Sequence, residues 1–151
     1  RTKERLPNNI GEFTVSLGKI EVTNQGEDIT LVTYGSTWKV VMDAVGKLKR
    51  AGISCEVIDI QTLVPFDLSH DILESVKKTN RLIILEESWP FASISTEITY
   101  RVQDEAFDYL DAPIKRITTS DTPAPYSPVL FEKWLPSSQN VIDAVKEVMY
   151  L

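Results

Sequence analysis

The feature that most restricts the fold of this chain is a regular alternation between short apolar runs and longer segments with one apolar face. The apolar runs are rich in β-branched and aliphatic residues, as in strands buried on both sides, and occupy residues 29–34, 54–60, 82–85 and 114–118. The segments between and after them repeat apolar residues at helical spacing, over residues 40–48, 72–78, 94–106 and 141–149. This order predicts a mostly parallel sheet with helices on both faces, a three-layer α/β/α sandwich.

Residues at the ends of the first helical segment agree with this reading. Ser36 or Thr37 can cap its start. Lys49 and Arg50 suit the negative end of a helix, and Gly52 then stops it.

Three segments lie outside the alternation. Residues 1–18 are interpreted as a connecting linker arm, and residues 19–151 as the domain itself. Residues 19–22 predict a short strand that can pair antiparallel at one edge of the sheet. Residues 123–136 contain four prolines and predict a loop before the last helix.

Composition narrows the classes of function. A length of 151 residues fits one domain, and the net charge of −6 repels nucleic acid and anionic membranes while favouring a basic protein partner. No apolar stretch approaches the roughly 20 residues that a membrane-spanning helix needs. The polar start lacks the apolar core of a signal peptide, and a single cysteine indicates a reducing compartment.

Catalytic chemistry finds little support in the sequence. His70 is the only histidine and is interpreted as a solvated residue at a helix start. Cys55 lies in an apolar run without a nearby base, which favours a buried structural thiol. Zinc, phosphate-loop and dinucleotide motifs are not found. We therefore predict no catalytic, cofactor-binding or metal-binding residue in this chain.

Two places keep a functional interpretation open. Glu86 and Glu87 follow an apolar run, where α/β proteins usually bind ligands, although Glu87 can instead cap the next turn or line a subunit contact. The turn at residues 34–37 offers backbone N–H groups to a phosphate, as the flavin turn of flavodoxin-like proteins does. Trp38 replaces the rest of that motif. A free-standing flavin-binding module is thus the alternative from a different functional class.

Several motifs in the same order resemble the C-terminal domain of the pyruvate dehydrogenase E1 component β subunit, in the transketolase superfamily. The resemblance spans residues 10–151 and includes Ile10-Gly11-Glu12-Phe13, Gly26-Glu27-Asp28-Ile29, Glu56-Val57-Ile58-Asp59, Glu86-Glu87-Ser88-Trp89-Pro90, Tyr109-Leu110-Asp111-Ala112-Pro113 and Thr122-Pro123-Ala124-Pro125-Tyr126.

Within this family, Trp89 and Pro90 favour a pyruvate-type over a branched-chain-type enzyme. Relatives commonly place glycine after this pair, whereas residues 91–95 contain none and are in part closer to the branched-chain type. A branched-chain 2-oxoacid dehydrogenase β subunit therefore remains an alternative.

The resemblance implies that the cofactor binds, and the reaction takes place, outside this segment. Thiamin diphosphate and Mg²⁺ bind between the α subunit and the N-terminal domain of the β subunit, outside this segment. The complete enzyme oxidatively decarboxylates pyruvate to acetyl-dihydrolipoyl-E2. The present chain would be inactive alone and would bind no cofactor itself.

The resemblance also implies protein partners: the E1 α subunit, a second E1 β subunit in an α2β2 heterotetramer, and the basic peripheral-subunit-binding domain of the E2 acetyltransferase. Asp111 and the terminal carboxylate of Leu151 are the residues expected to bind E2, although Asp111 can instead start the turn before Pro113. Glu87, Trp89 and Pro90 are expected at a subunit interface. A multienzyme complex of this kind implies the bacterial cytoplasm, or the mitochondrial matrix in a eukaryote.

Overall fold

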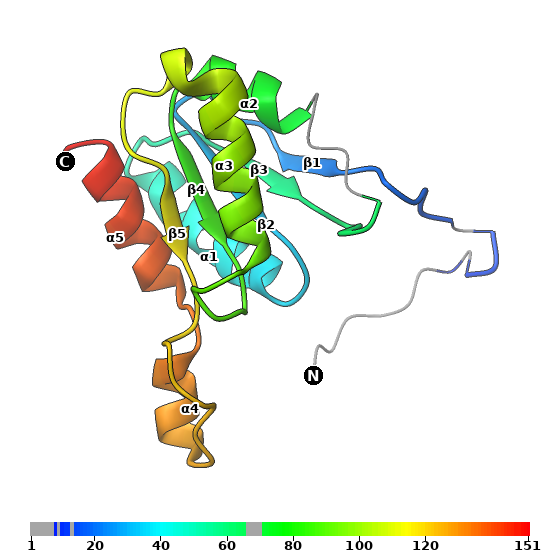
Figure 1. Cartoon of the computed structure of the whole chain (residues 1–151), viewed down its shortest axis with the longest axis vertical. Coiled ribbons are helices and arrows are strands. Elements are labelled where there is room, and N and C mark those ends of the chain that lie inside the picture. The colour runs from blue at the N-terminus through cyan, green and yellow to red at the C-terminus, as the bar shows by residue number, and fades with distance from the viewer. Residues whose placement is uncertain (1–7, 9, 13, 66–70) are drawn as a thin grey trace.

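A single five-stranded sheet organises the computed structural model, which describes residues 8, 10–12, 14–65 and 71–151 (Figure 1). The strands lie in the order β1-β3-β2-β4-β5. Their bounds are β1 Glu21–Asn24, β2 Ile29–Thr33, β3 Cys55–Asp59, β4 Leu82–Leu85 and β5 Lys115–Ile117. Strands β3, β2, β4 and β5 are parallel, and β1 pairs antiparallel with β3 at the edge. The predicted mostly parallel sheet with an antiparallel edge strand is confirmed.

Helices cover both faces of this sheet, as expected for strands that are apolar on both sides. The helices are α1 Thr37–Arg50, α2 Asp71–Thr79, α3 Ile94–Ala106, η1 Phe107–Tyr109, α4 Pro128–Trp134 and α5 Ser138–Val148. Helices α1 and α5 lie on one face, and α2 and α3 on the other (Figure 1). Successive strand residues alternate between the two cores: Leu31 packs towards α1 and α5, whereas Val32 packs towards α2 and α3. The three-layer sandwich is therefore confirmed.

The edge strand begins later than predicted, at Glu21 instead of residue 19. The pairing with β3 fixes this start, because Glu21 lies opposite Asp59 and Val22 opposite Ile58. This register places two carboxylates side by side, and like charges in opposite positions of a strand pair are unfavourable. Burial, followed by the charge of Glu21, raises the pKa of Asp59.

We expect Asp59→Asn to stabilise the domain by about 0.5 kcal/mol near neutral pH. Because the pKa of Asp59 is raised on folding, the folded state binds more protons than the unfolded state above the ordinary value of 3.8. The wild type therefore loses stability as pH rises through that window, and the variant lacks this loss. Urea unfolding between pH 4 and 7 measures the difference; parallel curves for the two proteins would contradict the prediction.

Helix α4 corrects the sequence analysis, which predicted an uninterrupted loop over residues 123–136. The helix begins at Pro128, with Ser127 before it. Proline is tolerated in the first turn of a helix, because its missing N–H has no intrahelical partner there. The prolines around this segment therefore did not exclude a helix. In Figure 1, α4 extends away from the sheet beyond the end of β5.

Candidate functional site

The carboxyl ends of β2 and β4 meet where the strand order reverses, since β3 flanks β2 on one side and β5 flanks β4 on the other. Ligands of open α/β sheets usually bind at such a point. Here it holds Glu86, whose side chain is fully buried. The hydroxyl of Tyr34 donates to Glu86 Oε2 at 2.9 Å, and the Ser95 N–H donates to the same oxygen at 3.3 Å. The Ser95 hydroxyl donates to Oε1.

These contacts make Glu86 a structural carboxylate that joins β4 to the start of α3. Burial and the neighbouring Glu86 raise the pKa of the Tyr34 phenol above its usual range. Tyr34 therefore keeps the proton that it donates. Of the two interpretations that the sequence left open for Glu86, the geometry favours the structural one.

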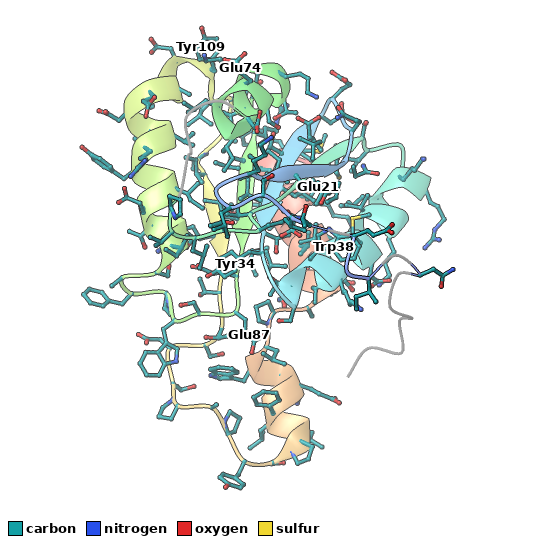
Figure 2. All side chains as sticks on the ribbon, turned by 90° about the vertical axis from the view of Figure 1, so that its right-hand side faces the viewer. Glu21, Tyr34, Trp38, Glu74, Glu87 and Tyr109 are labelled. Carbon is teal, nitrogen blue, oxygen red and sulfur yellow. The ribbon has the colours of Figure 1, made fainter. Side chains whose placement is uncertain are left out.

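The turn after β2 uses its hydroxyl groups internally. Ser36 Oγ donates to Glu87 Oε2 at 2.6 Å, and Thr37 Oγ1 donates to the carbonyl oxygen of Tyr34 at 2.7 Å. Ser36, one of the two residues predicted to cap α1, occupies its N-cap position, but its side chain makes no capping bond. Figure 2 shows Tyr34 and Glu87 near the end of the sheet that faces α4. The exposed Glu87 carboxylate places negative charge beside this turn, which opposes a flavin phosphate.

The loop after β4 presents aromatic side chains to solvent. Trp89 is 56% exposed and Phe91 is 87% exposed. Pro90 is half-buried, and its carbonyl oxygen accepts a bond from Arg116 Nη1 at 3.0 Å. Arg116 Nη1 also donates to Thr96 Oγ1 at 2.8 Å, at the start of α3. Arg116 thus holds the loop backbone while the rings remain outside the core.

Helix α4 extends this apolar surface. None of its seven residues is buried, and Val129, Leu130 and Phe131 are 65%, 55% and 37% exposed. Phe131 stacks on Trp134 with 5.7 Å between ring centroids. A helix of this length gains little from its intrinsic propensity and normally depends on packing. Exposed apolar groups of this kind are typical of surfaces that bind a partner or a ligand. Sequence reasoning missed the part of this surface that α4 contributes, although Ser127 and Pro128 before an apolar run were an available helix-start signal.

The opposite end of the sheet carries the two residues predicted to bind E2. Asp111 follows η1, and its side chain is 57% exposed. Arg81 Nη2 lies 3.4 Å from Asp111 Oδ2, while Arg81 Nε donates to the carbonyl oxygen of Val148 at 3.2 Å. Leu151, three residues after Val148, is 75% exposed. Through Arg81, the structure brings Asp111 to the last turn of α5.

Cys55, the other described titratable residue singled out in the sequence, supplies no reactive group. Cys55 is 2% exposed, and burial, followed by the charge of Asp28, raises its pKa to about 12. The thiol is therefore protonated and inert at neutral pH. His70 lies outside the described residues. Within residues 14–65 and 71–151, no three His, Cys, Asp or Glu side chains are grouped so that they can hold a metal ion. The described helices include none that is long and apolar enough to cross a bilayer.

Comparison with known proteins places this geometry in a family. Residues 18–141 match the family model of the transketolase C-terminal domain. The chain belongs to this family. The sequence motifs had indicated this family, and the match to the family model confirms the resemblance.

Two bacterial relatives show how far the similarity of this transketolase C-terminal domain extends. The chain is 44% identical over 137 residues to the pyruvate dehydrogenase E1 component subunit β of Rickettsia bellii, and the match covers 91% of this chain and 42% of the relative. The chain is 42% identical over 137 residues to the acetoin:2,6-dichlorophenolindophenol oxidoreductase subunit β of Bacillus subtilis, and this match covers 91% of the chain and 40% of the relative. The chain thus spans about two fifths of the relatives that it matches.

Solved structures agree on the fold of this transketolase C-terminal domain. An inactive β4 tetramer of a split-gene transketolase superposes with a TM-score of 0.79 at 23% identity, covering 93% of this chain and 45% of that one. At this level of identity the likeness supports the architecture alone.

Proposed function

We propose that this chain is the C-terminal assembly and E2-docking domain of a pyruvate dehydrogenase E1 component β subunit. The observation that carries the proposal is the 44% identity to such a subunit over 91% of the chain. The geometry supports it, because the buried polar groups at the sheet switch point bond to one another while apolar and charged groups face outward at the two ends. A second E1 β subunit and the E1 α subunit are the assembly partners.

The reaction itself is proposed to occur outside this domain. Thiamin diphosphate and Mg²⁺ would supply the decarboxylation chemistry in the complete enzyme. The described residues do not fit that cofactor: they hold no cluster of three His, Cys, Asp or Glu side chains that could bind a metal ion, and the Glu87 carboxylate places negative charge beside the turn at Ser36, the phosphate-type turn singled out in the sequence. We therefore expect this chain to be inactive alone.

Pyruvate is the proposed substrate of the complete enzyme. The Trp89-Pro90 pair supports pyruvate over branched-chain 2-oxoacids. The acetoin-enzyme relative is almost as similar as the pyruvate-enzyme relative, at 42% against 44% identity. Such near equality is expected if residues outside this domain select the substrate. Relatives occur in bacteria and in mitochondria, and we place this protein in the bacterial cytoplasm or, in a eukaryote, the mitochondrial matrix.

The carboxyl end of the sheet is proposed as the assembly surface. Glu87, Trp89 and Pro90 would contribute the interface residues expected from the sequence, and α4 would add Leu130 and Phe131. Large aromatic and aliphatic side chains are typical of subunit interface cores. Covering them with another subunit would also supply the packing that a seven-residue helix needs.

The opposite end is proposed as the E2-docking surface. Asp111 and Leu151 would face the basic peripheral-subunit-binding domain of E2. The last turn of α3 adjoins this end and contains Asp104 and Glu105 without a basic residue, which opposes the helix dipole. Negative charge here would accelerate and orient the approach of a basic partner.

We expect Asp111→Asn to weaken binding of the E2 peripheral-subunit-binding segment about three- to tenfold, because it removes one partly exposed charge from the contact. Isothermal titration calorimetry measures the change. Asp108→Asn is the matched control, since it removes the same charge from an exposed position of η1. Equal affinities for the two variants would remove Asp111 from the docking site.

A further inference from the structure

Arg81 contacts both structural elements that the docking proposal uses. It directly precedes β4 and is the more recessed member of its ion pair, with a side chain 24% exposed against 57% for Asp111. Its guanidinium reaches Asp111 Oδ2 at 3.4 Å and the carbonyl oxygen of Val148 at 3.2 Å. A positive charge therefore lies directly beneath a carboxylate that faces solvent.

Asp111 does not depend on this guanidinium for its place. The Asp111 N–H donates to the carbonyl oxygen of Asn80 at 2.9 Å. The side chain of Asn80 donates to the carbonyl oxygen of Tyr109 at 2.8 Å. Asn80 itself has a positive φ of 61°, so a tight backbone turn fixes this anchor. The segment that carries Asp111 is thus held by bonds that leave the Arg81 side chain aside.

The end of the chain also has anchors of its own. The Leu151 N–H donates to the carbonyl oxygen of Lys146 at 3.0 Å. Lys115 Nζ lies 2.5 Å from Glu147 Oε1 and so ties α5 to β5. Arg81 therefore adds to this end of the domain its charge and one hydrogen bond to Val148, while the backbone at Asp111 and at Leu151 has hydrogen bonds of its own.

We propose that Arg81 is an internal counter-ion that restrains docking. It pairs with Asp111 in the free domain, and a basic partner has to share or displace it. This inference rests on the proposed docking function and adds a restraint on affinity to that site. A cation 3.4 Å from the carboxylate lowers the attraction that Asp111 exerts on an approaching cation.

The test is a calorimetric titration of the full chain with the E2 peripheral-subunit-binding segment. Arg81→Gln removes the charge and keeps a hydrogen-bond donor, and we expect it to tighten binding about two- to fivefold at low salt. The gain should shrink as added salt screens the charges. Arg81→Lys keeps the charge and should bind like the wild type. Arg101→Gln makes the same change of net charge at an exposed pair with Glu97 and should have a smaller effect.

The outcomes separate this inference from the docking proposal. Tighter binding by Arg81→Gln that disappears in the Asp111→Asn background supports the restraint. If the wild type binds but Arg81→Gln binds no more tightly than Arg101→Gln, the restraint is overturned and the docking proposal stands. If the wild type and all variants fail to bind, docking and the restraint fall together.

Discussion

Gly26→Ala is expected to destabilise the domain by at least about 3 kcal/mol, the largest loss that we predict for a single added methyl group. Gly26 is buried in the turn between β1 and β2. A Cβ atom at this position would lie 2.1 Å from the carbonyl carbon of Cys55 and 2.3 Å from the backbone nitrogen of Glu56. Both are backbone atoms of β3, which cannot move without disturbing the centre of the sheet. Urea unfolding, or loss of soluble protein, measures the effect.

Gly46→Ala is the matched control for this change. Gly46 is exposed within α1, and nothing lies within 4 Å of a Cβ atom built there. Replacing a helical glycine by alanine should stabilise the domain by about 1 kcal/mol, because alanine loses less backbone entropy on folding. The same chemical change should thus have opposite signs at two positions. A Gly26→Ala protein as stable as the wild type would show that β3 does not pack against the turn as described.

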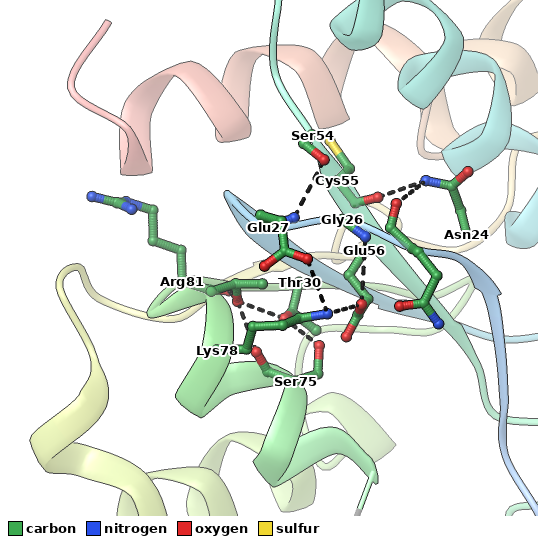
Figure 3. Close-up of polar contacts among 12 residues, drawn as sticks. Asn24, Gly26, Glu27, Thr30, Ser54, Cys55, Glu56, Ser75, Lys78 and Arg81 are labelled. Atoms are coloured by element: carbon green, nitrogen blue, oxygen red, sulfur yellow. Dashed lines mark hydrogen bonds and ion pairs between the residues drawn. The ribbon is translucent and has the colours of Figure 1, made fainter.

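The second large effect is expected at the ion pair between Lys78 and Glu56, which Figure 3 shows between α2 and β3. The Glu56 side chain is 5% exposed and accepts bonds from Lys78 Nζ and from the Gly26 N–H. Lys78→Met would leave this carboxylate inside the protein without its cation. We expect a loss of about 2–4 kcal/mol, below the value for a fully buried pair because Lys78 is 33% exposed.

Two comparisons isolate that contribution in urea unfolding experiments. Lys77→Met, one residue earlier on the same helix, breaks an exposed pair with Glu74 and should change stability much less. Adding Glu56→Gln to Lys78→Met removes the orphaned charge and should recover much of the loss. If Lys78→Met cost no more than Lys77→Met, the pair would behave as a surface contact and the prediction would be wrong.

The sequence predicted those parts of the fold that depend on local patterns. The apolar run at residues 82–85 coincides with β4. A strand that is buried on both faces is apolar at every position, so the apolar run marks where it begins and ends. The edge strand was displaced, since its position depends on the pairing of Glu21 with Asp59 on a distant segment. Helix α4 was missed because it has no buried face that would produce a periodic signal.

The contacts of the candidate surfaces were less predictable, because they join residues that are far apart in the chain. Asp111 could be singled out from its motif, but its pairing with Arg81, thirty positions earlier, needed the fold. For Glu86 the sequence left a ligand-binding and a structural interpretation open, and in the structure Tyr34 and Ser95 both donate hydrogen bonds to its carboxylate. Polar residues in a sequence do not reveal whether their partner is another residue of the chain or an external ligand.

We propose that this domain recognises other proteins while the 2-oxoacid chemistry takes place elsewhere in the enzyme. Dye reduction by the purified chain, supplied with pyruvate, thiamin diphosphate and Mg²⁺, tests it most directly. We predict a rate no higher than that of the coenzyme mixture without protein. Sustained, pyruvate-dependent reduction that copurifies with the chain would contradict the account.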